Sequence, residues 1–262
     1  MVGKAAVLIG CNYPGTKAEL KGCVNDVHRM RRCLIDHFGF TEANITILID
    51  TDDSYTLPTG VNIRRAINRL VRSANPGDDD LFLHFSGHGA RLPAQPEEND
   101  NTGYHECIVP CDMNLIIDED FRHFVNKLAD GCRLTIVADS CNSGGLIENA
   151  KEQIGESTAK RKDEGNESRE DIHLTGRALP IPILVELLKE STGKEDIHEG
   201  NIRSTIIDAF GDSASPRLAK TAPSGRSVLI SACQSDQNAA DAKPVMKPEE
   251  HMVLSATQFR AY

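Results

Sequence analysis

The chain lacks the long apolar segment and the positive charge that would mark a membrane or nucleic-acid-binding protein. Its longest apolar run near the start, Ala5 to Gly10, is far shorter than the roughly 18 residues of a membrane span, and it has no charged signal-peptide flank. The 29 Lys and Arg are outnumbered by 39 Asp and Glu, for a formal charge of -10, and no basic block offsets this excess. Because that charge repels phosphate backbones and anionic lipids, we expect a cytoplasmic protein that binds neither nucleic acid nor membranes.

Internal repeats are also lacking, as is any glycine-rich loop with Walker or dinucleotide-binding spacing, so a flavodoxin-like small-ligand binder is a distant alternative. The eight cysteines are spread through 262 residues without a secretory signal, which favours reduced thiols over a disulfide framework. Cys107 and Cys111, next to His105, could suggest zinc, but no second pair follows at finger-like distance. Small hydrophobic residues on a short strand are the better interpretation.

The chain does contain enough apolar sequence, 39% of its residues, to bury one substantial core. Short apolar runs predict strands at residues 4–10, 44–49, 80–85, 133–138 and 226–232. Apolar residues recurring every three or four positions predict helices over 24–38, after Thr59 and from Asp118. Strand alternating with helix favours a mainly parallel sheet covered on both faces, with a site at the carboxyl ends of its strands.

Changes in composition divide the chain into three parts. Residues 1–150 carry the alternating strand and helix pattern. Residues 151–225 form a predicted linker, because the segment to Asp171 has hardly an apolar residue and only helical fragments, at 183–188 and 202–210, follow. Residues 226–262 hold one clear strand and then a tail with little periodicity.

Reactive residues follow two of the predicted strands, each within a segment rich in glycine and other small residues. Phe85-Ser-Gly-His-Gly89 follows the third strand, and Ala138-Asp-Ser-Cys-Asn-Ser-Gly-Gly145 follows the fourth. A cysteine where a strand gives way to a helix meets free N–H groups that favour the attacking thiolate. His88 precedes Cys141 by 53 residues, close to the offset of about 50 residues in caspases. A lone buried cysteine is usually inert, but these surroundings favour a nucleophile with His88 as its base, whereas His84, in mid-strand, is expected to be only packed.

With these motifs the chain resembles the plant type II metacaspases, of peptidase family C14 in the caspase-like clan of cysteine endopeptidases. The similar segments run in order through the first 156 residues: 7–15, 20–26, 84–89, 106–112, 139–146 and 151–156. The resemblance implies an α/β caspase-haemoglobinase-like sandwich, with a mainly parallel central sheet and helices on both faces. It also implies a Cys141/His88 dyad and cleavage of peptide bonds after Arg or Lys, with self-processing in the linker.

The resemblance assigns roles to further residues. The backbone N–H groups of Gly89 and Cys141 are the expected oxyanion donors. The residues expected around the substrate's basic side chain, where paired carboxylates would hold a guanidinium by charge-assisted bonds, are Asp26, Asp139, Ser86 and Asp236. Among the basic residues of the predicted linker, Lys220 is the expected self-cleavage site. The expected partners are protein or peptide substrates with Arg or Lys before the scissile bond, and the chain is expected to be a monomer.

Calcium is the expected cofactor, and no organic cofactor is expected. Oxygen ligands gathered from separate loops suit this ion, and the expected ligands are Asp118, Glu119, Asp120, Glu148 and Asp100. In the resembled family calcium activates many members. A solvated acidic face is the alternative reading of these residues.

The chain departs from the family pattern in three places. Asn142 stands beside the expected nucleophile where His is common, and His105 stands where Asp is usual. The region after Asp241 does not continue with the expected small-subunit elements, so the small-subunit part is apparently truncated. These departures leave a second hypothesis open, in which the chain is a catalytically weak or silent caspase-like regulatory or binding module.

Overall fold

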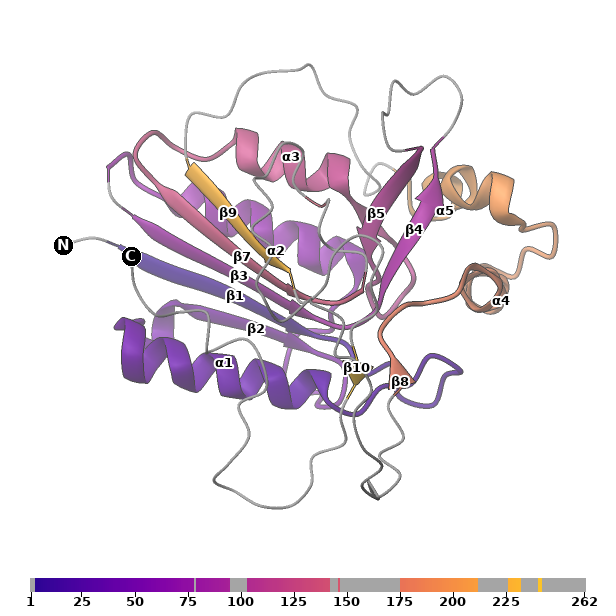
Figure 1. The fold of residues 1–262 in the computed structure, drawn as a ribbon, viewed down its shortest axis with the longest axis horizontal. Coiled ribbons are helices and arrows are strands. Elements are labelled where there is room, and N and C mark those ends of the chain that lie inside the picture. The colour runs from indigo at the N-terminus through magenta and orange to yellow at the C-terminus, as the bar shows by residue number, and fades with distance from the viewer. Residues whose placement is uncertain are drawn as a thin grey trace, which may run out of the picture.

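The computed structural model describes residues 3–77, 79–94, 103–141, 146, 175–211, 226–231 and 240–241. A five-stranded sheet in the order β2-β1-β3-β7-β9 lies at its centre (Figure 1), and all four strand pairings are parallel. Its strands are β1 (Lys4–Gly10), β2 (Ile45–Ile49), β3 (Asp80–Ser86), β7 (Arg133–Asp139) and β9 (Arg226–Ser231). The predicted strands and the predicted mainly parallel α/β fold are therefore confirmed.

Helices cover both faces of this sheet (Figure 1). On one face, α1 (Cys23–Phe38) packs Val27, Met30 and Leu34 into a cluster with alternate residues of the strands. On the other face lie α2 (Gly60–Ser73) and α3 (Asp118–Asn126), which begin where the sequence predicts. The Thr59 hydroxyl caps α2 by accepting a hydrogen bond from the Asn62 N–H at 3.3 Å. Burial on both faces explains why the strands read as continuous apolar runs.

A second, three-stranded antiparallel sheet stands beside the first and was not predicted. It consists of β4 (Gly89–Pro93), β5 (Tyr104–Ile108) and β6 (Ile116–Ile117), in the order β4-β5-β6. The strand expected at 107–111 is only partly correct, since β5 ends at Ile108 and Cys111 lies outside it. Cys107 and Cys111 are free thiols, and the described residues hold no cluster of three or more metal-ligating side chains.

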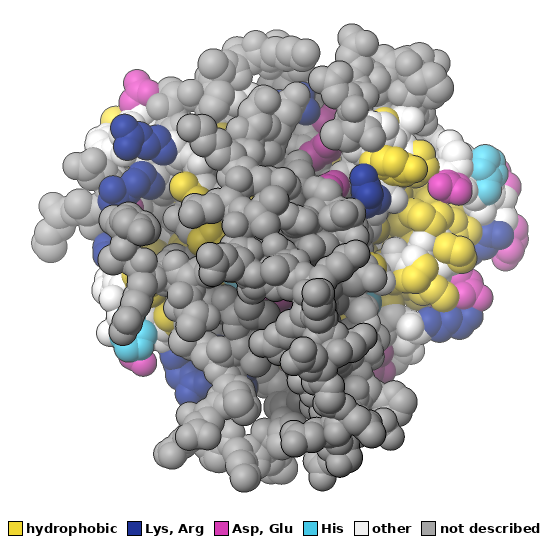
Figure 2. Space-filling model, in the orientation of Figure 1, with side chains coloured by type: hydrophobic (Ala, Val, Ile, Leu, Met, Phe, Trp, Pro, Cys, Tyr) yellow, Lys and Arg dark blue, Asp and Glu magenta, His cyan; other side chains and the backbone are white. Residues whose placement is uncertain are grey.

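The segment 175–211 packs outside this small sheet (Figure 1). It contains β8 (Thr175–Gly176), α4 (Ile181–Thr192), the 3-10 turn η3 (Glu199–Asn201) and α5 (Ile202–Phe210), and β8 pairs with β10 (Ala240–Asp241). A further turn, η1 (Glu42–Asn44), precedes β2. Hydrophobic side chains reach the surface where α4 and α5 lie (Figure 2), and Ile207 of α5 is 48% exposed. Within the described ranges, no helix is long and apolar enough to cross a membrane.

Candidate active site

The adjacent carboxyl ends of β3 and β7 bring His88 and Cys141 to one place. Ser86 and Asp139, the last residues of these strands, are register partners, and His88 and Cys141 each follow two positions later. A Cβ on Gly89 would lie 1.8 Å from the Cys141 carbonyl oxygen, so the two chain segments approach as closely as only glycine permits. His88 and Cys141 are both buried.

The imidazole of His88 has a defined orientation. Its Nε2 lies 2.8 Å from the carbonyl oxygen of Ala18, in the loop between β1 and α1. Because a carbonyl oxygen can only accept, this contact assigns the proton of the neutral ring to Nε2 and leaves Nδ1 as the basic nitrogen. His88 can therefore receive a proton at Nδ1 while Nε2 keeps its carbonyl partner.

Three residues predicted to line a basic-side-chain pocket surround one guanidinium, that of Arg177. Its terminal nitrogens lie 2.8 Å from Asp26 Oδ2 and 2.8 Å from Asp139 Oδ2, and one of them donates to Ser86 Oγ at 2.9 Å. The Ser86 hydroxyl in turn donates to Asp26 Oδ2 at 2.9 Å. Only 4% of the Arg177 side chain is exposed, against 25% of Asp26 and 32% of Asp139. The acids come from α1 and β7, so the pocket exists only in the folded chain.

The backbone of the Arg177 segment pairs with Gly89. The Gly89 N–H donates to the Arg177 carbonyl oxygen at 3.0 Å, and the Leu179 N–H donates to the Gly89 carbonyl oxygen at 2.9 Å. Gly89 and Ala178 form a parallel bridge, and the Leu179 side chain is buried. The carbonyl of the Arg177–Ala178 peptide bond thus rests on one of the two expected oxyanion donors, while the Arg177 side chain fills the acidic pocket.

Burial and the charged groups of this pocket shift the pKa values of Arg177 and of the nearby His84. Burial by itself lowers the pKa of Arg177, but the acidic groups of Cys23, Asp139 and Asp26 outweigh it and raise the pKa above the ordinary arginine value. His84, two residues before Ser86 on β3, is fully buried, and burial lowers its pKa to about 4. Asp26 acts to raise the pKa of His84 and Arg177 acts to lower it. His84 is thus packed in mid-strand as expected, within electrostatic reach of the pocket.

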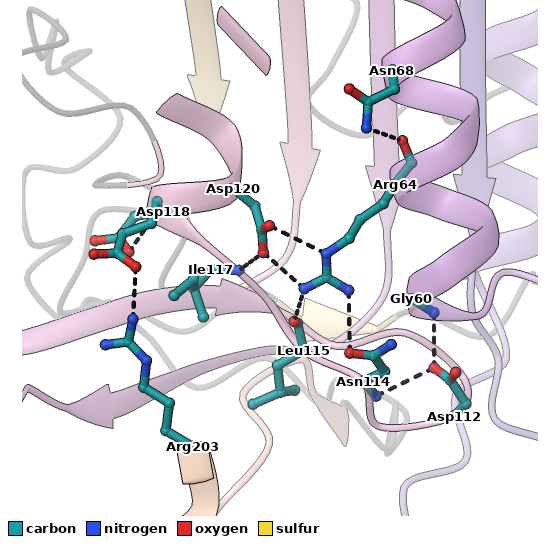
Figure 3. Close-up of polar contacts among 11 residues, drawn as sticks. Gly60, Arg64, Asn68, Asp112, Asn114, Leu115, Ile117, Asp118, Asp120 and Arg203 are labelled. Carbon is teal, nitrogen blue, oxygen red and sulfur yellow. Dashed lines mark hydrogen bonds and ion pairs between the residues drawn. The ribbon is translucent and has the colours of Figure 1, made fainter. Parts of the chain in front are cut away.

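The expected calcium ligand Asp120 does not fit that role. It is buried, and Arg64 of α2 holds both of its carboxylate oxygens, at 3.2 Å and 2.8 Å (Figure 3). The Ile117 N–H also donates to Asp120 Oδ2 at 3.1 Å. Arg64 makes further bonds to Asn114 Oδ1 and to the Leu115 carbonyl oxygen. Because these partners occupy its oxygens, Asp120 is a structural residue that links α3 to α2.

Asp118 and Glu119, at the start of α3, are less buried and also have cationic or histidine partners. His105 Nδ1 lies 3.0 Å from Asp118 Oδ1, and Arg203 of α5 donates to Glu119 Oε2 at 2.6 Å. Arg203 also approaches His105 Nε2 at 3.2 Å. These contacts tie α5 to α3 and β5, and the two carboxylates stay 18% and 32% exposed.

Four of the predicted site residues, Asp236, Glu148, Asp100 and Lys220, lie outside the described residues, as does Asn142. Sequence reasoning missed Arg177 altogether. The local signal is weak: Arg177 is a basic residue inside the predicted linker, three positions before Pro180, the N-cap of α4. That signal is local, whereas the pairing of Arg177 with α1 and β7 is not.

Comparisons with known proteins point to one family. The family model described as metacaspase, peptidase C14 domain, matches residues 4–150. The chain is 49% identical to Metacaspase-4 of Arabidopsis thaliana over 83% of its own length, and 55% identical to Metacaspase-6 of the same plant over 84%. It spans 64% and 61% of the lengths of these two relatives.

A solved structure is similar at the level of the fold. The crystal structure of protein GSU0716 from Geobacter sulfurreducens aligns with a TM-score of 0.60 at 20% sequence identity. The alignment covers 92% of this chain and 76% of that chain. It supports the α/β architecture of the central sheet and its helices.

Proposed function

The chain belongs to the metacaspase family, and on that premise we propose that it is a cysteine endopeptidase that cleaves peptide bonds after Arg or Lys. Cys141 is the nucleophile and His88 the general base of this reaction. Asp26, Ser86 and Asp139 bind the basic side chain that precedes the scissile bond.

One observation carries the proposal: the chain's own Arg177 lies in the site as a substrate residue would. Its guanidinium contacts Asp26, Ser86 and Asp139 while its carbonyl oxygen accepts from the Gly89 N–H. Charge-assisted bonds to two carboxylates select a cation, and a carbonyl on a backbone donor is the arrangement that stabilises a developing oxyanion.

The residues divide the reaction into two steps. The Cys141 thiol passes its proton to His88 Nδ1 as the sulfur bonds to the carbonyl carbon, and the Gly89 N–H stabilises the oxyanion. The C–N bond then breaks, the imidazolium protonates the leaving amine, and a thioester remains. Water hydrolyses the thioester with His88 again as base, which releases the acid and restores the thiol.

The test is release of fluorophore from peptides ending in Arg, Lys or Asp. We expect hydrolysis of the Arg and Lys peptides alone, abolished in Cys141→Ala and retained in Cys33→Ala, which changes a free cysteine of α1 outside the site. If the folded chain hydrolyses none of the peptides, it is the catalytically silent regulatory module instead. Equal hydrolysis of the Asp peptide would refute the specificity.

Self-processing is part of the proposal, with Arg177 as a position that the structure adds to the predicted Lys220, which lies outside the described residues. The Arg177 carbonyl accepts a hydrogen bond from Gly89, next to Cys141, so among the basic residues that the structure describes the Arg177–Ala178 bond is favoured for attack. Mass spectrometry of the incubated chain should find a fragment beginning at Ala178, absent in Arg177→Gln and present in the matched Lys220→Gln. A fragment beginning at Thr221 in its place would favour Lys220 instead.

Calcium activation is proposed to act at Asp118 and Glu119. Their carboxylates are partly exposed and offer the oxygen ligands that a divalent cation prefers, whereas the Asp120 carboxylate is buried against Arg64. A bound calcium ion would neutralise these carboxylates in competition with Arg203 and His105. Calcium binding, measured by calorimetry, should weaken in Glu119→Gln. The stimulation of peptide hydrolysis by calcium, relative to chelator, should weaken in the same variant. Neither should change in the exposed control Glu195→Gln. Full activity in chelator would refute this part.

A further inference from the structure

The loop between β1 and α1 restrains His88 from two directions. Besides the Ala18 carbonyl at Nε2, the hydroxyl of Tyr13 accepts a hydrogen bond from the backbone N–H of His88 at 2.9 Å. The rings of Tyr13 and His88 lie 5.0 Å apart, tilted by 34°. One loop therefore sets both the backbone and the ring of the proposed base.

Tyr13 is held firmly in this position. It is buried, and its hydroxyl also donates to the Val109 carbonyl oxygen at 2.6 Å. Its φ of +51° lies in the left-handed region, which a non-glycine residue keeps only when its surroundings enforce it. A Cβ on Gly87 would lie 2.9 Å from the Tyr13 hydroxyl, so the glycine before His88 makes room for this contact.

Asp50 holds the Tyr13 backbone in this left-handed conformation. It directly follows β2, the neighbour of β1, and its two carboxylate oxygens accept from the N–H groups of Asn12 at 2.9 Å and Tyr13 at 2.7 Å. Asp50 thus fixes the backbone of the loop at the residue with the unusual φ. A chain of contacts runs from β2 through Tyr13 to His88.

We infer that Asp50 and Tyr13 are positioning residues for His88: Asp50 holds the loop backbone, and the Tyr13 hydroxyl holds the His88 backbone so that the imidazole keeps its Ala18 contact and presents Nδ1 to Cys141. This role rests on the proposed Cys141/His88 dyad. Neither residue contacts the Arg177 pocket in the interactions described above, so the two residues act on the chemical step and not on binding of the basic side chain.

Tyr13→Phe tests the inference because it keeps the ring and removes only the hydroxyl. We expect kcat for the Arg peptide to fall about ten- to a hundredfold, with KM within about twofold of wild type. Asp50→Asn leaves one oxygen for two N–H groups, so kcat should fall in the same way but less. The matched control is Tyr55→Phe, next to His28 and outside the site, which should change neither constant.

A second readout does not depend on turnover. In a Cys141→Ala background, 15N NMR of the imidazole, assigned with His88→Gln, should show the proton on Nε2. Tyr13→Phe releases the His88 backbone and so loosens the contact between Nε2 and the Ala18 carbonyl, which should give a mixture of tautomers. Unchanged kcat together with an unchanged tautomer would overturn the inference. Absence of Cys141-dependent hydrolysis in the wild type would instead overturn the proposed function, and the NMR result would still decide whether Tyr13 orients His88.

Discussion

Among the described residues, the Arg64 and Arg177 clusters both pair arginine with carboxylates, and they differ in how the pairs are buried. At the start of α3, Arg64 and Asp120 are 10% and 1% exposed, and both belong to the packed body of the fold. In the pocket beside Cys141, Arg177 is 4% exposed, but Asp26 and Asp139 keep a quarter to a third of their side chains in solvent.

This difference in exposure indicates which carboxylates can exchange one cationic partner for another. The Asp120 side chain is 1% exposed and both its oxygens are bonded to Arg64, so a new cation could reach it only if α2 and α3 separated. Asp26 and Asp139 can be solvated when Arg177 leaves, because water reaches them already. The same chemistry therefore stabilises the fold in one cluster and suits replaceable binding of a basic side chain in the other.

The largest expected effect comes from breaking the buried cluster. Arg64→Ala, in a Cys141→Ala background, should lower the free energy of unfolding by about 3–5 kcal/mol, because the Asp120 carboxylate stays buried without a cation. Urea denaturation measures this loss. The matched change Arg65→Ala, on the exposed face of the same helix, should cost within about 0.5 kcal/mol. Equal losses in both variants would contradict the assignment of Asp120 as a structural residue.

Next in size is the effect of removing charge from the pocket. Asp26→Asn should lower kcat/KM for the Arg peptide roughly 100-fold, because an amide cannot make the charge-assisted bond to the guanidinium. The exposed Asp36→Asn, on the same helix, serves as the control and should match the wild type. An unchanged kcat/KM in Asp26→Asn would contradict this prediction and mean that Asp139 alone selects the basic side chain.

The third prediction concerns the pH dependence of stability, because the charged groups of the Arg177 pocket act on the pKa of His84. The folded pKa of His84, about 4, lies below its ordinary value of 6.5, so the unfolded chain binds the proton more tightly. The stability that this adds is present above pH 6.5 and is lost as the pH falls towards 4, at up to about 1.4 kcal/mol per pH unit.

Urea denaturation at several pH values measures this loss, which His84→Gln should flatten. Arg177→Gln should raise the pKa of His84 and so reduce the loss, since the guanidinium acts to lower that pKa. Identical pH slopes in all three chains would show that His84 does not control this transition.

The smallest effect on the free energy of unfolding is expected at the partly exposed ion pair between Arg203 and Glu119. Arg203→Ala should lower the free energy of unfolding by at most about 1 kcal/mol, because Arg203 and Glu119 are 22% and 32% exposed and water screens their attraction. A loss in urea denaturation as large as that of Arg64→Ala would mean that α5 is held mainly through this contact.

Much of the fold could be predicted because its signals are local. The apolar run at residues 4–10 predicts β1 within a residue, and the cap at Thr59 and the acid at Asp118 mark the starts of α2 and α3. The small sheet of β4, β5 and β6 escaped prediction. Its strands are two to five residues long, and their partners lie across loops, so no window of sequence carries a clear period.

The candidate site could be predicted in part. His88 and Cys141 follow neighbouring strands, so a parallel sheet brings them together, and Asp26 and Asp139 converge as the family resemblance implies; their roles stay predictions. Asp120 looked like its neighbours Asp118 and Glu119, because its burial depends on Arg64, 56 positions earlier in the chain.

The sequence by itself determined the alternation of strands and helices around the central sheet, the family, and the two strand ends that carry the proposed dyad, since all of these follow from short-range periodicity and motifs. Only the tertiary structure decided that Arg177 fills the pocket, that Asp120 is paired with Arg64, and that Tyr13 and Asp50 restrain His88. Those contacts join residues 37 to 151 positions apart, and such partners are selected by the packing of the whole chain.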